Sequence, residues 1–297
     1  MRPISRRQFL QRGTLAAAAT AAALASSIPR PAWANPLGKP IGLQLYTVAD
    51  ALEKDFRSTL RLISAIGYKE VEPAGYAGQS ATQFRAALDA ADLNCHSVHL
   101  QMNSPDLTSV FEDAHALGAH FVVCSAMFPP TASSPPALDD YKRLAALLND
   151  LGQKAERAKL RYAYHNHNFE FRLLENGKPG YDTLLAETDP ALVDFELDCG
   201  WMIAAGVNPI QYFQNFPHRY RMLHIKDFTA ASKISTSLSV DRPTGTELGR
   251  GHIDYKPIFD AAAKTDVQYY YVEQEPPFPD MTSLDAVKID YDYLHNL

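Results

Sequence analysis

The chain has 297 residues, of which 46% are hydrophobic and 21% charged, with 15 glycines, 20 prolines and 3 cysteines. This composition is that of an ordinary globular protein, and it excludes the collagen, low-complexity and disulfide-scaffold classes. The formal charge is −6, and residues 1–34 hold 5 arginines and no acidic residue, so the remainder carries −11. Because so acidic a body repels phosphate backbones, we expect no nucleic-acid binding.

The N-terminal segment resembles a twin-arginine export signal. Ser5-Arg6-Arg7-Gln8-Phe9-Leu10 precedes a mildly apolar run over 15–28, and Ala32-Trp33-Ala34 fits the small-x-small cleavage pattern. The run is shorter than the roughly 20 apolar residues that a membrane-spanning helix needs, so we expect no stable membrane span. We therefore predict a signal peptide over 1–34, a mature domain over 35–297 and a periplasmic location. The alternative is an ordinary N-terminal helix.

The three cysteines give little sign of a disulfide. Cys95, Cys124 and Cys199 are odd in number and lie in apolar, strand-like segments. An oxidising compartment would permit disulfides, but this placement favours buried thiols.

Short β-rich runs alternate eight times with helix-compatible runs after Pro40, which is the pattern of a parallel sheet covered by helices. The expected strands are 41–46, 69–72, 94–99, 120–124, 161–165, 193–198, 221–225 and 268–273. The expected helices are 56–66, 81–91, 107–117, 138–159, 181–187, 209–216, 256–264 and 283–294. We predict a single-domain (β/α)₈ TIM barrel, with a doubly wound open sheet as the alternative.

Two features of the connections support this order of elements. Gly67 and Gly118 stand where helices should end, at positions suited to a positive φ. The longest stretch without periodicity, 228–254, follows the seventh strand. Loops of this length are often lids or disordered, and we interpret this one as a segment that covers the substrate.

Ionisable residues gather at the carboxyl ends of the later strands, where TIM barrels place their chemistry. The fifth to eighth strands end in His165-Asn166-His167-Asn168-Phe169-Glu170, Glu196-Leu197-Asp198, His224-Ile225-Lys226-Asp227 and Glu273-Gln274-Glu275. The first three strands add Gln44, Tyr46, Glu72, His96 and His99. Burying so many charges is costly unless they pair or bind a cation. We predict one divalent metal ion (Mn²⁺, Mg²⁺, Co²⁺ or Zn²⁺), with Asp198, His224 and Glu273 as the first candidate ligands.

In this order and spacing the motifs resemble the xylose isomerase-like barrels known as sugar phosphate isomerases or epimerases. The resemblance covers residues 41 to about 294. It rests on Gly42-Leu43-Gln44-Leu45-Tyr46, Tyr164-His165-Asn166-His167-Asn168-Phe169-Glu170-Phe171, Phe195-Glu196-Leu197-Asp198, Leu223-His224-Ile225-Lys226-Asp227, Glu247-Leu248-Gly249-Arg250-Gly251-His252-Ile253-Asp254 and Val272-Glu273-Gln274.

The resemblance implies one divalent metal held by Glu, Asp, His and Glu from strands five to eight. Asp198, His224 and Glu273 match the last three. Where the family usually has the first Glu, this chain has His165, with His167 two residues on. These two face the same way if the strand continues. Either His165 or Glu170 completes the set, and His167 is then a ligand or a base.

The resemblance also implies a reaction. The family's epimerases use two metal-bound glutamates as acid and base to move a proton next to a sugar carbonyl, through an enediolate. Here Glu273 and His165 take these roles, because an imidazole titrates near neutrality. Lys226, His99 and His167 are candidates to hold hydroxyls or to donate to the oxyanion. For Lys226, an ion pair with Asp227 or Glu196 is equally compatible.

We therefore predict a sugar isomerase or epimerase, with a lyase that cleaves a 3-keto glycoside by β-elimination as the alternative. A non-catalytic periplasmic sugar-binding protein is the alternative from another class. Export favours a free keto sugar or keto glycoside over a sugar phosphate. Gln44, Trp201 and Arg250 are further candidates for substrate binding. A DNA-repair endonuclease shares the barrel, but it needs more metal ligands and a basic groove, which the charge of −11 disfavours.

Overall fold

The computed structural model describes residues 37–100, 107–125 and 135–297. The expected signal over 1–34 lies outside the described residues. None of the described helices is long and apolar enough to cross a membrane. Cys95, Cys124 and Cys199 are all buried, and none of them forms a disulfide within the described residues.

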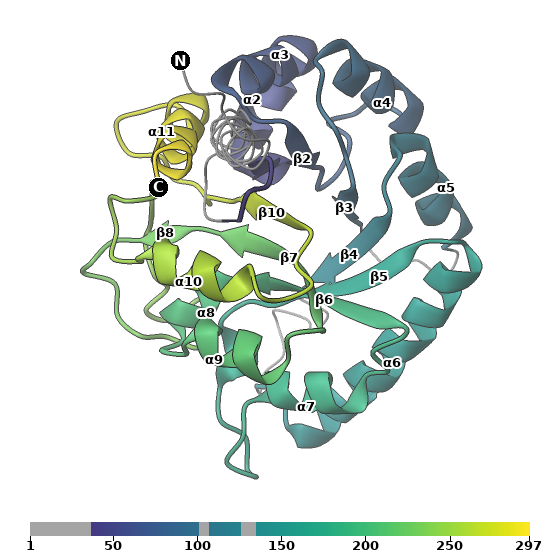
Figure 1. The fold of residues 1–297 in the computed structure, drawn as a ribbon, viewed down its shortest axis with the longest axis vertical. Helices are drawn as coiled ribbons and strands as arrows, with labels where there is room; N and C mark the ends of the chain where they lie inside the picture. The colour runs from purple at the N-terminus through teal and green to yellow at the C-terminus, as the bar shows by residue number, and fades with distance from the viewer. Residues whose placement is uncertain (1–36, 101–106, 126–134) are drawn as a thin grey trace, which may run out of the picture. The chain divides into compact units, whose positions relative to one another are not determined.

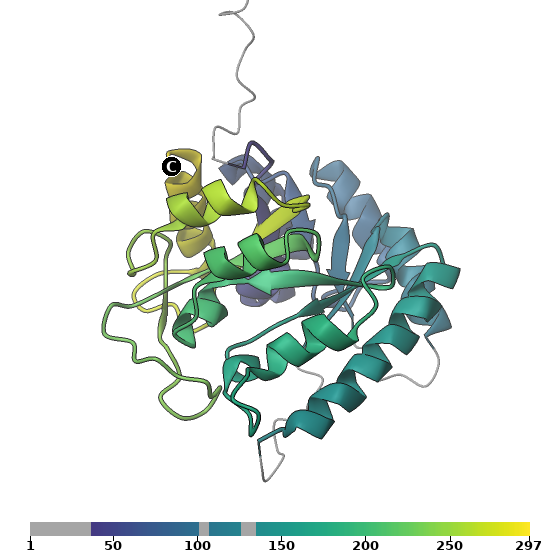
Figure 2. The same cartoon turned by 60° about the horizontal axis from the view of Figure 1, so that its bottom comes forward.

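Eight parallel strands form a nearly closed ring with helices outside it, seen from two directions in Figure 1 and Figure 2. In ring order they are β2 (Glu70–Glu72), β1 (Gly42–Gln44), β10 (Tyr269–Val272), β7 (Tyr220–Ile225), β6 (Val193–Asp198), β5 (Arg161–His165), β4 (Phe121–Ser125) and β3 (Ser97–His99). The ends of this order meet at a parallel bridge between Glu70 and Asn94, beside which Val71 N donates to Asn94 O over 2.8 Å. The predicted TIM barrel is confirmed, and the open sheet is excluded.

The helices that follow the strands match the expected ones within a few residues. They are α3 (Phe56–Ile66), α4 (Ala81–Ala90), α5 (Thr108–Leu117), α6 (Leu138–Arg157), α7 (Gly180–Glu187), α9 (Pro209–Asn215), α10 (Tyr255–Ala262) and α11 (Ser283–His295). Gly67 and Gly118 end α3 and α5 with φ of 129° and 79°, as their positions predicted.

Four short helical segments were not expected. They are the 3₁₀ turns η1 (Leu45–Val48) and η2 (Phe169–Phe171) and the helices α2 (Ala49–Lys54) and α8 (Cys199–Ala204). Helix α8 is an apolar run that directly follows a buried strand, and periodicity does not separate two such segments.

The interior of the barrel is apolar toward the amino ends of the strands and polar toward their carboxyl ends. Phe121, Val123, Ala163, Met222 and Tyr271 form the apolar cluster between the strands. Side chains alternate along a strand, so the residues two positions further toward the carboxyl ends also face inward. These include the histidines and glutamates of the candidate site. The rest of the apolar core packs between the strands and the helices.

The segment 228–254 is tied to the end of β7 by one carboxylate. A short antiparallel pair joins β8 (Asp227–Phe228) to β9 (Gly245–Thr246). The buried Asp227 carboxylate accepts backbone N–H groups over 2.9–3.2 Å from Phe228, Gly249, Gly251, His252 and Ile253. Its expected role over a substrate stays a prediction.

Candidate metal centre and active site

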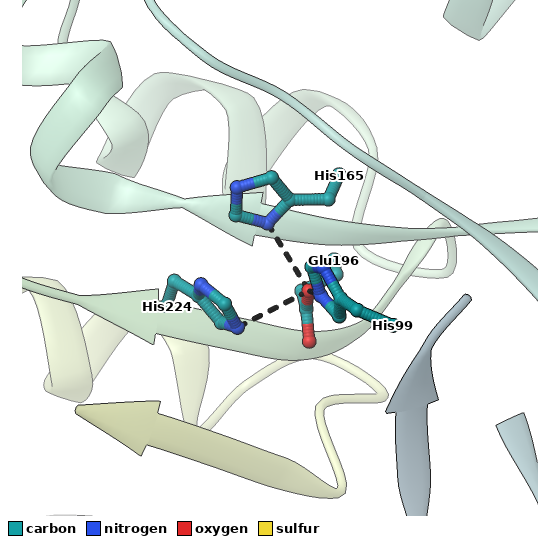
Figure 3. A group of neighbouring side chains, drawn as sticks. All are labelled: His99, His165, Glu196 and His224. Carbon is teal, nitrogen blue, oxygen red and sulfur yellow. Dashed lines mark hydrogen bonds and ion pairs between the residues drawn. The ribbon is translucent and has the colours of Figure 1, made fainter. Parts of the chain in front are cut away.

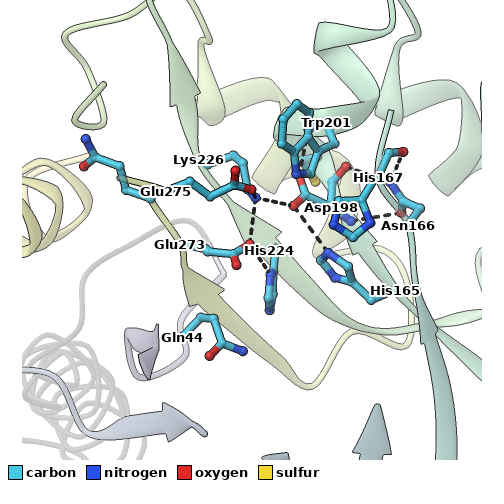
Figure 4. A network of polar contacts seen from close by, with 12 residues as sticks. Gln44, His165, Asn166, His167, Asp198, Trp201, His224, Lys226, Glu273 and Glu275 are labelled. Atoms are coloured by element: carbon cyan, nitrogen blue, oxygen red, sulfur yellow. Dashed lines mark hydrogen bonds and ion pairs between the residues drawn. The ribbon is translucent and has the colours of Figure 1, made fainter. Parts of the chain in front are cut away.

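Four side chains from neighbouring strands converge at the carboxyl end of the barrel (Figure 4). His165 ends β5, Asp198 ends β6, His224 lies in β7 and Glu273 follows β10. Each offers one ligand atom, and these four atoms lie within 4.8 Å of one another. The structure therefore brings the three sequence-predicted ligands together and adds His165 to them. We call this set the upper group.

An ammonium group lies against the carboxylates of the upper group. Lys226 Nζ lies 2.9 Å from Asp198 Oδ2, 2.7 Å from Glu273 Oε2 and 3.4 Å from Glu275 Oε1. These are not the partners considered from the sequence, because β7 carries Lys226 into the barrel mouth beside Asp198 and Glu273.

Burial would raise the pKa of Glu273, but Lys226 and His224 bring it well below its ordinary value. Burial would likewise lower the pKa of Lys226, and Asp198 and Glu273 raise it. The pair is therefore held in its charged form.

Asp198 is fixed by three hydrogen bonds outside the group. Its Oδ1 accepts Trp201 N over 2.7 Å and so caps the short helix α8 (Cys199–Ala204). The Asn166 side chain binds both the backbone N and the backbone O of Asp198, over 3.1 and 3.3 Å. A Cβ at Gly200 would lie 2.2 Å from Lys226 Cγ, so glycine is needed where the lysine crosses this helix. The second carboxylate oxygen of Asp198 is thereby aimed at the upper group.

Glu170 lies apart from the upper group. Its Oε1 accepts the Tyr164 hydroxyl over 2.8 Å and its Oε2 accepts His167 N over 3.0 Å. Tyr164 faces the helix layer because it alternates with His165 along β5, and the turn η2 carries Glu170 to that side. Burial raises the pKa of Glu170 to about 7. Of the two residues considered for completing the ligand set, the structure therefore places His165 in the group.

His167 lies beside the upper group but is not one of its members. Its ring centroid is 5.2 Å from that of His165 and 6.0 Å from that of Trp201. Its Nδ1 is buried and has no hydrogen-bond partner among the described residues. Burial and the nearby Lys226 lower the pKa of His167 to about 3. The imidazole is therefore neutral and retains a free ring nitrogen.

A second polar group, which we call the lower group, consists of His99, His165, Glu196 and His224 (Figure 3). It shares His165 and His224 with the upper group. His99 Nε2 lies 2.7 Å from Glu196 Oε2, and His165 Nδ1 lies 3.1 Å from the same oxygen. The buried Glu72 joins it, with His224 Nε2 at 2.7 Å.

These contacts affect both protonation and the expected roles. Burial would lower the pKa of His99, but Glu72 and Glu196 raise it to about 10. Gln44 Nε2 donates to Glu72 Oε2 over 2.9 Å. His99 and Gln44, expected to bind substrate, thus both contact buried carboxylates.

Sequence reasoning named Glu72 and Glu196 among the ionisable residues at the strand ends but did not choose either as a ligand, catalytic or substrate-binding residue. A usable signal was present for Glu196, because Glu196-Leu197-Asp198 at the end of an interior strand places both acids in the barrel. Glu72 carried a weaker signal, because the second strand, Glu70-Val71-Glu72, offers two acids and only the second lies at its carboxyl end.

A cavity of about 290 Å³ opens beside Lys226 and is bordered by Phe228, Arg242, Gln274 and Glu275. Trp201, expected to stack on a sugar, is only 1% exposed, and Lys226 Nζ lies 5.1 Å from the centre of its ring. The neighbouring Arg242, which the sequence did not single out, lies over the same ring and pairs with Glu275. At this cavity the structure therefore places Arg242, rather than the predicted Trp201, where a side chain could contact a bound molecule.

Arg250 does not border this cavity. Its side chain is half exposed and pairs with Glu247, the Nη1 to Oε2 distance being 3.2 Å. The substrate-binding role expected for Arg250 therefore has no support from its position.

A family model described as xylose isomerase-like TIM barrel matches residues 60–286. The chain belongs to this family. The inosose dehydratase of Clostridium tetani is 29% identical over 149 residues, which is 46% of this chain and 49% of that protein. The chain thus matches about half the length of this curated relative.

Two solved structures show the same fold over most of the chain. A sugar phosphate isomerase/epimerase from Parabacteroides distasonis is 25% identical with a TM-score of 0.71, over 86% of this chain and 97% of that one. The 3-keto-D-glucoside 4-epimerase YcjR from E. coli is 17% identical with a TM-score of 0.65, over 87% and 100%.

Proposed function

We propose that the protein is a divalent-metal-dependent isomerase or epimerase that removes the proton next to the carbonyl of a keto sugar. One observation carries the proposal: His165, Asp198, His224 and Glu273 present four ligand atoms within 4.8 Å of one another. A cavity of about 290 Å³ beside Lys226 leaves room for a small molecule. The isomerase/epimerase from Parabacteroides distasonis supports the reaction class.

The residues of the upper group fit a divalent ion. Two imidazoles and two carboxylates, with no thiolate, suit Mn²⁺, Mg²⁺, Co²⁺ or Zn²⁺. Asp198 is held by its backbone and by Oδ1, so its Oδ2, which lies 2.9 Å from Lys226 Nζ, is the oxygen that would act as a ligand. When bound, such an ion stabilises the negative charge that develops on the carbonyl oxygen.

The chain's own residues supply the proton transfers. His165 Nδ1 lies against Glu196, which leaves Nε2 facing the upper group. When Asp198, His224 and Glu273 hold the ion, this nitrogen is not a ligand and takes or returns the proton. Glu273 follows β10, which β7 and β6 separate from the strand of His165, β5, and it acts as the partner base. Lys226 Nζ holds Glu273 and donates to a substrate oxygen.

A second candidate is elimination from a 3-keto glycoside after the same first step. The curated relative is a dehydratase, which favours loss of a leaving group over return of the proton. The ammonium of Lys226 is placed to protonate a departing oxygen. The two outcomes differ only in what happens after the proton is removed.

We also propose export by the twin-arginine route, on the strength of the pattern in residues 1–34. A periplasmic enzyme would meet free keto sugars or keto glycosides rather than sugar phosphates, so this is the substrate class proposed. Fusing residues 1–36 to a reporter that is active only after export tests the location, with Arg6 and Arg7 replaced by lysine as the control. Export unchanged by that replacement contradicts the route.

Incubation of the metal-loaded protein with a panel of keto sugars and keto glycosides in D₂O tests the activity. Deuterium next to the carbonyl without bond cleavage supports the isomerase or epimerase, and release of the aglycone supports the lyase. Sugar binding without exchange indicates a binding protein and contradicts both. Asp198→Asn should abolish exchange, whereas Asp254→Asn, an exposed helix cap, is the matched control.

A further inference from the structure

The lower group is a second place where ligand atoms converge. His99 Nε2, His165 Nδ1 and His224 Nε2 lie 2.7, 3.1 and 3.3 Å from Glu196 Oε2. One ligand atom from each of the four residues lies within 4.8 Å of the others. Figure 3 shows the three imidazoles around the carboxylate.

The two groups share their histidines through opposite ring nitrogens. His165 turns Nδ1 to Glu196 and Nε2 toward Asp198 at 3.7 Å. His224 turns Nε2 toward Glu72 and Nδ1 to Glu273 at 2.9 Å. A neutral imidazole has one free lone pair, so the two histidines serve one position at a time.

The charges of the two groups are balanced differently. In the upper group, Lys226 already lies within 2.9 Å of both carboxylates. In the lower group, the contacts of Glu72 and Glu196 within the described part of the chain are Gln44, Ser97 and three histidines, with no lysine or arginine. The second oxygen of Glu196, Oε1, is buried and has no partner among the described residues.

We propose that the barrel holds a second divalent-cation position made by His99, His165, Glu196 and His224, which the ion occupies when no substrate is bound. Three imidazoles and one carboxylate form a donor set typical of Zn²⁺ and related ions. In that state Lys226 neutralises Asp198 and Glu273. The inference rests on the proposed function in one respect only, which is that the ion in this position is the ion used in the proposed reaction.

X-ray absorption of the full-length, substrate-free protein loaded with Zn²⁺ alone tests the position, because it counts imidazole ligands. We expect three imidazoles in the wild type, two in His99→Asn and three in Asp198→Asn. We also expect the affinity for Zn²⁺ to fall at least 10-fold in His99→Asn. His96→Asn is the matched control, because His96 also lies near a buried glutamate, Glu70, at 3.4 Å, but outside both groups.

Two imidazoles in the wild type, with binding lost in Asp198→Asn and unchanged in His99→Asn, overturn the proposal. If His99→Asn does not fold, Glu196→Gln replaces it, and the imidazole count of the wild type still decides. Failure of the proposed activity is read separately, by deuterium exchange into the sugar, so the two outcomes are distinguishable.

Discussion

Replacing Asp227 by asparagine should destabilise the protein markedly, because one carboxylate organises the segment that borders the cavity. Oδ1 accepts the N–H groups of Phe228, His252 and Ile253, and Oδ2 accepts those of Gly249 and Gly251. An amide retains three acceptor contacts at best and turns an NH₂ group toward the two glycine N–H groups.

The expected loss is that of two hydrogen bonds to a charged acceptor, each worth about 1.5–3 kcal/mol, or about 3–6 kcal/mol in all. For a domain of this size that lowers Tm by roughly 10 °C. Urea denaturation followed by circular dichroism measures the free energy of unfolding.

Asp254→Asn is the matched control for Asp227→Asn. Asp254 Oδ1 caps α10 (Tyr255–Ala262) by accepting Lys256 N over 3.1 Å, and asparagine caps a helix about as well. Its effect should stay within about 0.5 kcal/mol. If Asp227→Asn also falls within about 1 kcal/mol of the wild type, the carboxylate does not organise the segment and the reasoning is refuted.

Three further predictions concern burial, the ligand set and the metal. Burial raises the pKa of Asp290 to about 8, so between about pH 4 and 8 the unfolded chain releases a proton that the folded protein keeps. The free energy of unfolding therefore falls by up to about 1.4 kcal/mol per pH unit as pH rises through this range. In denaturation experiments at pH 5 and pH 8, the stability of Asp290→Asn relative to the wild type should be higher at pH 8 than at pH 5. The same difference in stability at both pH values would contradict this. Glu170→Gln should leave the affinity for Zn²⁺ unchanged in calorimetry. It should lower the free energy of unfolding by about 1 kcal/mol, because it weakens the hydrogen bond from Tyr164. Loss of Zn²⁺ binding in this variant would instead show that Glu170 is a metal ligand. Removal of the metal by a chelator should lower Tm reversibly in scanning calorimetry, and an unchanged Tm would argue against a bound ion.

Much of the fold follows from local patterns in the sequence. Each buried strand is short and β-rich, and each following helix has its own apolar face. Gly67 and Gly118 mark the ends of two helices at positions where φ is positive. The apolar run of α8 (Cys199–Ala204) was missed because it is only 6 residues long and follows a buried strand directly after Asp198.

The site was predictable where a residue lies at the carboxyl end of its own strand, as Asp198 does in β6 and Glu273 does directly after β10. Contacts that depend on closure of the barrel were not predictable. Glu72 meets His224 only because β2 and β7 face each other across the interior, and their sequence separation of 152 residues carries no sign of this. The burial of Trp201 depends in the same way on Lys226 and Phe228, which come from another strand and its loop.

The account depends most on a metal that makes a sugar C–H acidic. Proton NMR in D₂O measures exchange of the hydrogen next to the carbonyl of a keto sugar by the metal-loaded protein, by the chelated protein and after metal is restored. The account predicts exchange that stops on chelation and returns with the ion. Exchange that continues at the same rate without metal, or that never occurs with any keto sugar, would contradict it.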